Sequence, residues 1–102
     1  MAKLDNENRL QIDENFIEKA NLDKSKKIYL HHSGDEFFLT NQDKLQFNSY
    51  NLGEIELDDS NKILLNDRVK LLGRFTNDCR ILIYSTNEFV VFTRIFFIPE
   101  NR

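Results

Sequence analysis

The feature that most constrains this chain is a pattern that occurs twice, at a spacing of 53 residues. The stretch DNENRLQID occupies residues 5–13, and DDSNKILLN occupies residues 58–66. Each begins with Asp, passes through a polar turn that ends in Asn, and places a cation (Arg9 or Lys62) before an apolar alternation. A residue suited to capping a helix closes each stretch.

The same spacing aligns residues 2–40 with residues 55–93 without a gap. Few aligned residues are identical, but many agree in apolar class: Leu10/Ile63, Ile12/Leu65, Phe16/Val69, Leu22/Phe75, Leu30/Ile83, Phe37/Val90, Phe38/Val91 and Leu39/Phe92. A repeat in pattern with little identity is typical of one supersecondary unit used twice. We therefore expect one domain over residues 1–102, made of repeat one (1–41), a connector (42–53), repeat two (54–94) and a tail (95–102).

Each copy is expected to fold as β-turn-β-α-β-turn-β. Apolar residues alternate where strands are predicted and recur at three- and four-residue steps where helices are predicted. Asp13 and Asn66 are suited to accept the free amides of a first helical turn. The predicted strands are 2–4, 9–12, 27–32 and 36–40, then 54–57, 62–65, 80–85 and 89–93, with helices at about 14–21 and 67–74.

The two turns carry the charged residues of the pattern. Asn8 and Asn61 stand where a left-handed backbone is expected, which Asn tolerates better than most residues. The turns predict an ion pair across the strands of each copy, Asp5 with Arg9 and Asp58 with Lys62. Exposed pairs of this kind contribute only about 0–1 kcal/mol, so stability alone is a weak reason to repeat one.

These residues resemble the MraZ family, within the wider AbrB/SpoVT group of swapped-hairpin transcription factors. That family carries two such units, each with a D-x-x-x-R signature before an apolar strand, matched here by DNENRL at 5–10 and DDSNKILL at 58–65. The chain departs from the family pattern at Asn8 and Asn61, where glycine is usual, and at Lys62, where the planar fork of Arg is lost. Asp13 and Asn66 stand where the family often has proline, and the long helices usual between the units are not evident at 41–53.

The resemblance implies a mainly β fold with short helices, arranged as an intramolecular swapped-hairpin, double-psi-like barrel. It also implies a DNA-binding regulator that contacts promoter phosphates, as an oligomer, through Arg9 and Lys62. Asp5 and Asp58 would orient these cations, and the weaker candidates for phosphate contact are Lys3, Arg68, Lys70 and Arg74. Affinity would come from neutralising phosphates. Glu7 and Asp59 oppose this, because they place negative charge in the turns that should approach DNA.

A second hypothesis is a non-enzymatic assembly or protein-interaction module of the same fold, including antitoxin-like partner binding, with little affinity for DNA. The apolar stretch at 89–98 fits this hypothesis as an exposed strand edge that pairs with another chain. It fits an ordinary core strand equally well. A defined oligomer that shows no salt-sensitive retardation of DNA would favour the module.

Composition and isolated residues argue against an enzyme. The net charge is −3, apolar residues make up 40% and charged residues 30%, as in an ordinary globular domain. His31 and His32 are neighbours in a predicted strand, so their side chains point to opposite faces and cannot chelate one metal. Cys79 has no Cys or His at ligand spacing, and a single cysteine fits a reducing, cytoplasmic location. We expect no metal, cofactor, small-molecule substrate or membrane span, and association with the nucleoid if the protein binds DNA.

Overall fold

Strands dominate the computed structural model, which describes residues 2–95. In chain order the elements are β1 (Arg9–Gln11), α1 (Glu14–Lys19), β2 (Tyr29–Ser33), β3 (Glu36–Thr40), β4 (Tyr50–Glu54), β5 (Lys62–Leu64), α2 (Asp67–Gly73), β6 (Arg80–Ser85) and β7 (Val90–Ile95). All named strand pairs are antiparallel. The fold is therefore mainly antiparallel β with two short helices, as the sequence predicts.

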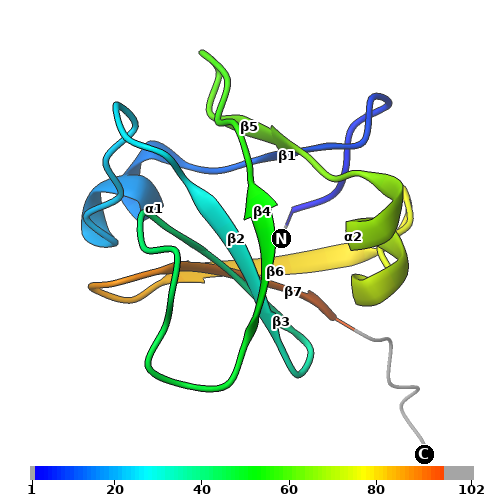
Figure 1. Ribbon diagram of the computed structural model, residues 1–102. Coiled ribbons are helices and arrows are strands. Elements are labelled where there is room, and N and C mark those ends of the chain that lie inside the picture. The colour runs from blue at the N-terminus through cyan, green and yellow to red at the C-terminus, as the bar shows by residue number, and fades with distance from the viewer. Residues whose placement is uncertain (1, 96–102) are drawn as a thin grey trace, which may run out of the picture.

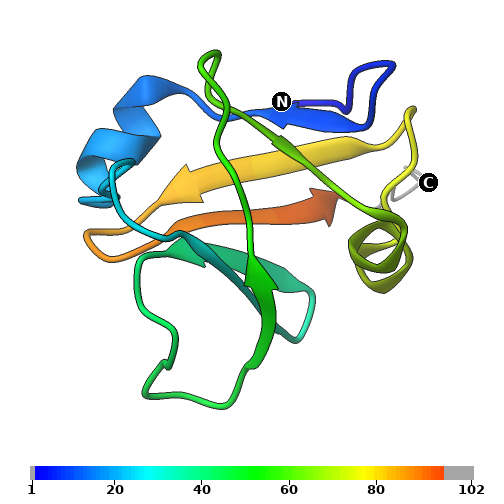
Figure 2. The ribbon, with the colours of Figure 1, turned by 45° about the horizontal axis from the view of Figure 1, so that its top comes forward.

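The strands form two sheets. β1 pairs with β5 in a two-stranded ribbon, and the other five strands lie in the order β4-β2-β3-β7-β6. Figures 1 and 2 show the ribbon lying across the five-stranded sheet, with α1 and α2 near its opposite ends. Within residues 2–95 these ladders do not join into a closed barrel.

Capping residues set where both helices begin. The side chain of Asp13 accepts a hydrogen bond from the Asn15 amide at 2.8 Å, and that of Asn66 accepts one from the Val69 amide at 2.9 Å. Both caps were predicted, because a short polar side chain can satisfy an amide that lacks a partner within the helix. The helices end slightly earlier than the predicted 14–21 and 67–74, at Lys19 and Gly73.

The core lies between the ribbon and the five-stranded sheet. Phe37 of β3 and Phe92 of β7 are both fully buried, with ring centroids 5.3 Å apart. Leu10 and Ile63 of the ribbon are fully buried as well. The apolar stretch expected at 89–98 contributes residues 90–95 to β7, which lies between β3 and β6 and is therefore not a free edge. Val90, Val91 and Phe92 of this strand are buried, and residues 96–98 lie outside the described part of the chain.

Residues 53 positions apart face each other at the centre of two ladders. Leu10 is opposite Ile63 in the β1–β5 ribbon, and Phe38 is opposite Val91 in the β3–β7 ladder. In an antiparallel ladder, the residue one position before the central residue of either strand then pairs with the residue one position after the central residue of the other strand. The register of both ladders is thus consistent with a local two-fold axis that passes through each central pair.

The segment that begins each half pairs with the hairpin of the other half. The Ala2 amide donates to the Ile81 carbonyl at 3.0 Å, and the Ile55 amide donates to the Ile28 carbonyl at 2.8 Å. The donors of these two bonds are 53 residues apart, and so are the acceptors. Each half is therefore completed by backbone from the other.

Strand β4 was not predicted, and it lies mostly in the expected connector at 42–53. It ends at Glu54, where the sequence predicts the start of a strand over 54–57, and Ala2 makes only an isolated bridge in place of the predicted strand 2–4. These two predictions are wrong. The physical reason is that β4 is held by the outer edge of β2, a contact between distant segments that local alternation cannot reveal.

Candidate nucleic-acid interface

The β1–β5 ribbon presents the two cations on which the DNA hypothesis depends. Leu10 and Ile63 point into the core, so their neighbours along each strand point to the opposite, outer face. These outer residues are Arg9, Gln11, Lys62 and Leu64, and Leu64 is 56% exposed. The ribbon is thus an amphipathic strand pair whose outer face is accessible.

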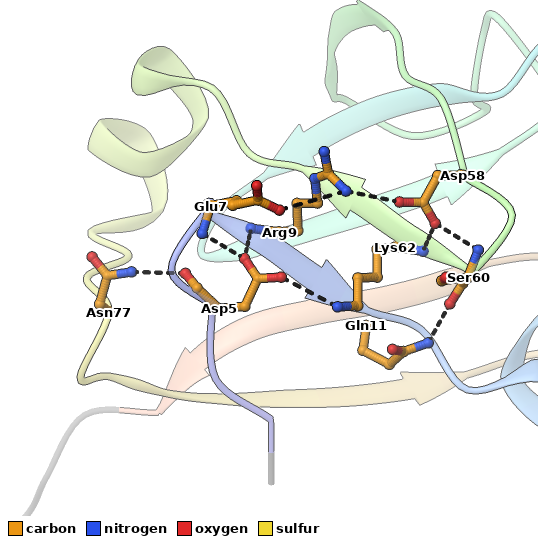
Figure 3. Close-up of polar contacts among 8 residues, drawn as sticks. All are labelled: Asp5, Glu7, Arg9, Gln11, Asp58, Ser60, Lys62 and Asn77. Carbon is orange, nitrogen blue, oxygen red and sulfur yellow. Dashed lines mark hydrogen bonds and ion pairs between the residues drawn. The ribbon is translucent and has the colours of Figure 1, made fainter.

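A polar turn precedes each strand of the ribbon and is held by its aspartate (Figure 3). One carboxylate oxygen of Asp5 accepts hydrogen bonds from the amides of Glu7 and Arg9, at 2.8 and 2.9 Å. Asp58 accepts the corresponding bonds from Ser60 and Lys62, at 2.8 and 2.9 Å. Figures 1 and 2 show both turns projecting from the same side of the molecule.

The left-handed residues of the turns are the two predicted asparagines. Asn8 has φ 64° and Asn61 has φ 60°. Lys70 of α2 donates a 2.9 Å hydrogen bond to the Asn8 side chain, and Asn61 donates one of the same length to Glu14. The first turn is therefore hydrogen-bonded to α2, and the second turn is hydrogen-bonded to α1.

The predicted ion pairs within each copy are wrong. Arg9 Nη1 lies 3.4 Å from Asp58 Oδ2, and Lys62 Nζ lies 3.3 Å from Asp5 Oδ2, so each cation pairs with the acid of the other turn. In both aspartates Oδ1 is already bound to the amides of its own turn, which leaves Oδ2 outward. The antiparallel ribbon then brings that oxygen beside the cation of the opposite strand (Figure 3).

The turn amides keep both aspartates ionised. Hydrogen bonds from the backbone, chiefly from the Arg9 amide, lower the pKa of Asp5, with a further contribution from Lys62. The pKa of Asp58 is lowered in the same way, chiefly by the Lys62 amide and also by the charge of Arg9. Glu7 adds a carboxylate 3.8 Å from Arg9. Three carboxylates, those of Asp5, Glu7 and Asp58, therefore accompany the two cations, and the ribbon is not a simple basic patch.

The weaker candidate cations are distributed unevenly around the ribbon. Lys70 joins it through Asn8, and Lys3 is an exposed residue shortly before the first turn. Arg68 is exposed on α2. Arg74 follows α2 with φ 57°, and its carbonyl accepts a hydrogen bond from Arg94 of β7, so it belongs to a different surface.

Two polar residues at the ribbon were missed. Gln11 lies on the same face as Arg9 and donates to the Ser60 carbonyl, and Asn77 donates to the Asp5 carbonyl at 3.0 Å. The alternation R-L-Q-I already places Gln11 beside Arg9 on the outer face and could have identified it. Nothing local marks Asn77, because its partner is distant in sequence.

The histidines and the cysteine occupy packing positions. His31 is 1% exposed, with Nε2 2.8 Å from the Gln42 carbonyl oxygen, and His32 stacks on Phe37 at a centroid distance of 4.5 Å. Cys79 is buried. In residues 2–95 no cluster of His, Cys, Asp or Glu could hold a metal ion. No helix in that range is long and apolar enough to cross a membrane.

Comparison of the chain with protein-family models, with curated proteins and with solved structures finds no match in any of the three.

Proposed function

We propose that this protein is a cytoplasmic DNA-binding transcriptional regulator, resembling MraZ, that contacts double-stranded DNA through the outer face of the β1–β5 ribbon. The observation that supports the proposal is the exposed, two-stranded antiparallel ribbon that carries Arg9, Gln11 and Lys62. The major groove of B-DNA admits a two-stranded β-ribbon, and Arg and Gln are side chains that pair with guanine and adenine edges. The proposal involves no catalysis, cofactor or small-molecule substrate.

We further propose that the chain consists of two tandem copies of one unit in a swapped-hairpin arrangement related to the AbrB barrel. Two facts support this. The halves exchange their first segments through the Ala2–Ile81 and Ile55–Ile28 contacts, and the central pair of the ribbon, Leu10 and Ile63, is 53 residues apart. A two-fold relation of this kind suits a DNA duplex, whose backbones are also related by two-fold axes.

The crossed ion pairs set the conditions for binding. A phosphate that approaches Arg9 must compete with Asp58, and this carboxylate stays in place because its other oxygen is bound to turn amides. Each chain therefore offers few net charges to DNA, and the formal charge of −3 adds no long-range attraction. We propose that the protein binds as an oligomer, so that several ribbons contribute to the affinity.

The test is retardation of duplexes selected from a random-sequence pool, measured at several salt concentrations. The double variant Arg9→Ala/Lys62→Ala should lose about tenfold or more in affinity, and the magnitude of the slope of log K against log salt should fall by about 2 for each chain whose ribbon contacts the duplex. A matched control is Lys19→Ala/Lys44→Ala, which removes the same charge from exposed sites off the ribbon. Thermal melting verifies that both variants fold. Equal binding by the two double variants would exclude the ribbon as the DNA contact.

The second candidate is a protein-interaction or assembly module of the same fold. The observation in its favour is that the acids of the turns neutralise both ribbon cations. Light scattering distinguishes the two: a defined oligomer with no salt-dependent retardation on any selected duplex supports the module.

A further inference from the structure

The two edges of the five-stranded sheet are covered to different extents. At one edge β4 runs along β2, with Glu54 opposite Tyr29 and Asn51 opposite His31. At the other edge, the backbone pairing that residues 2–95 show for β6 is the isolated bridge between Ala2 and Ile81, and helix α1 also packs near this strand. Backbone groups of an edge strand alternate in direction. Because the amide and carbonyl of Ile81 face outward to Ala2, those of Ile83 and Ser85 face outward as well, beyond the end of the bridge.

The outer edge of β2 shows how a strand can pair at the position that corresponds to the outer edge of β6. Ala2 and Ile55 make corresponding contacts, with Ile81 and Ile28 respectively. The chain just before Ile55 is β4, which runs along β2 of the first half and packs Leu52 against the core. No described residue takes the place of β4 beside β6.

A groove marks the vacant place. It has a volume of about 600 Å³ and lies beside β6, where its apolar lining includes Ala2, Ile12, Phe16, Ile81 and Ile83. The space at the corresponding place in the first half is about 270 Å³ and is lined by Leu30, Leu52, Ile55, Leu64 and Val69. The smaller space is the one into which β4 places a leucine, so the larger one has room for a side chain of that size.

The charged residues that line the groove indicate which side chains a segment bound there would carry. Asp13 and Glu14 line the groove beside β6. Glu14 already forms an ion pair with Lys24, at 3.1 Å, whereas Asp13 forms no ion pair within residues 2–95. Glu14 is held ionised by hydrogen bonds from Asn61 and Lys24, which lower its pKa. Asp13 is therefore the carboxylate at the polar end of this groove that a basic side chain of a bound segment would complement.

We infer that the outer edge of β6 binds an extended segment of a partner protein by strand addition. The segment runs antiparallel to β6 as β4 does to β2, pairs with the backbone of Ile83 and Ser85, and inserts a leucine-sized side chain into the groove. A Lys or Arg of the segment lies beside Asp13. In strand addition, main-chain bonds provide affinity and side-chain pockets provide specificity.

The probe is a synthetic peptide with the sequence of residues 48–54 carrying Glu54→Lys, titrated against the full chain by fluorescence anisotropy and by NMR. We expect saturable binding, with slower hydrogen exchange at the amides of Ile83 and Ser85. The same peptide with Leu52→Asp should bind at least about tenfold more weakly, because its side chain cannot fill an apolar groove. The peptide that retains Glu54 should bind several-fold more weakly than the lysine peptide.

Two further measurements separate the strand mechanism from other kinds of binding. A peptide with N-methylated amides on its β6-facing edge should lose binding, since it keeps its side chains but cannot complete the ladder. Replacing Asp13→Asn in the protein keeps a side chain that can cap α1 and should reduce the advantage of the lysine peptide over the Glu54 peptide. Absence of saturable binding, equal binding by the Leu52→Asp peptide, or protection at amides away from β6 would overturn the inference. Protection of Ile83 and Ser85 that rises with protein concentration alone would assign the edge to a second copy of this chain and overturn the partner assignment.

Discussion

The halves spanning residues 2–40 and 55–93 make corresponding turn, cap and ladder contacts with largely different side chains. The turn that contains Asn8 and the one that contains Asn61 have the same left-handed residue and the same pattern of amides donated to an aspartate. The halves differ at their outer strands: within residues 2–95, β2 has β4 as a neighbouring strand, and β6 has no such neighbour at the opposite edge of the sheet. The two segments thus share backbone geometry where an amide needs a partner, and they differ in the surface around it.

Substitutions at the centre of the ribbon should give the largest loss of stability, and the loss should be similar for the two strands. Leu10→Ala and Ile63→Ala each remove most of a side chain that is fully buried, and each should lower the free energy of unfolding by about 2–5 kcal/mol. Because the two side chains are opposite each other, the double variant should deviate from the sum of the single ones. Chemical denaturation measures all three.

Leu71→Ala is the matched control, since this side chain is 81% exposed and its loss should change stability by no more than about 0.5 kcal/mol. A loss below about 1 kcal/mol at only one of Leu10 and Ile63 would show that the two side chains contribute unequally to the stability of the ribbon.

The left-handed turn residues should give an intermediate effect. Alanine at Asn8 or at Asn61 should destabilise the fold by about 1–2 kcal/mol relative to glycine at the same position, because only glycine adopts this backbone without strain. Comparing Ala with Gly at one position cancels the lost side-chain contacts, which differ: Asn8 bonds Lys70, whereas Asn61 bonds Glu14 and Lys24. Thermal or chemical unfolding of the four variants gives the two differences. Unequal differences would mean that the turns are strained to different degrees.

Much of the fold was predictable from local pattern. The sequence predicted the ribbon strands, the hairpins and the caps at Asp13 and Asn66 to within a few residues. This was possible because alternation and capping depend on residues that are close in the sequence. Strand β4 was not, because YNLGE contains Asn and Gly and lacks a clear alternation; its strand conformation depends on the edge of β2.

The candidate site shows the same division. The sequence identifies Arg9 and Lys62 as the cations and Asp5 and Asp58 as the acids, but it pairs them within each turn. The observed pairs cross between turns, because the ribbon register decides which acid each cation meets. Register is a long-range property that a short motif does not contain.

The smallest effect at neutral pH, and the sharpest test of whether the two turns are equivalent, comes from the aspartates. The fold lowers the pKa of both Asp5 and Asp58, so their ionised forms stabilise it. That stabilisation is present above the ordinary aspartate pKa of about 4 and is lost as pH falls through the lower folded values. Melting temperature measured against pH should therefore fall less steeply below about pH 4 in Asp5→Asn and in Asp58→Asn than in the unsubstituted chain.

The control for this comparison is Asp59→Asn, which removes a charge from the second turn at a side chain that makes no hydrogen bond or ion pair within residues 2–95. It should leave the acid limb of the melting profile nearly unchanged. Because the amides dominate both pKa shifts, the two Asn variants should flatten the profile to a similar degree even though one loses a partner lysine and the other an arginine. A flattening confined to one of them would mean that the crossed cation, and not the turn, holds that carboxylate in its ionised form.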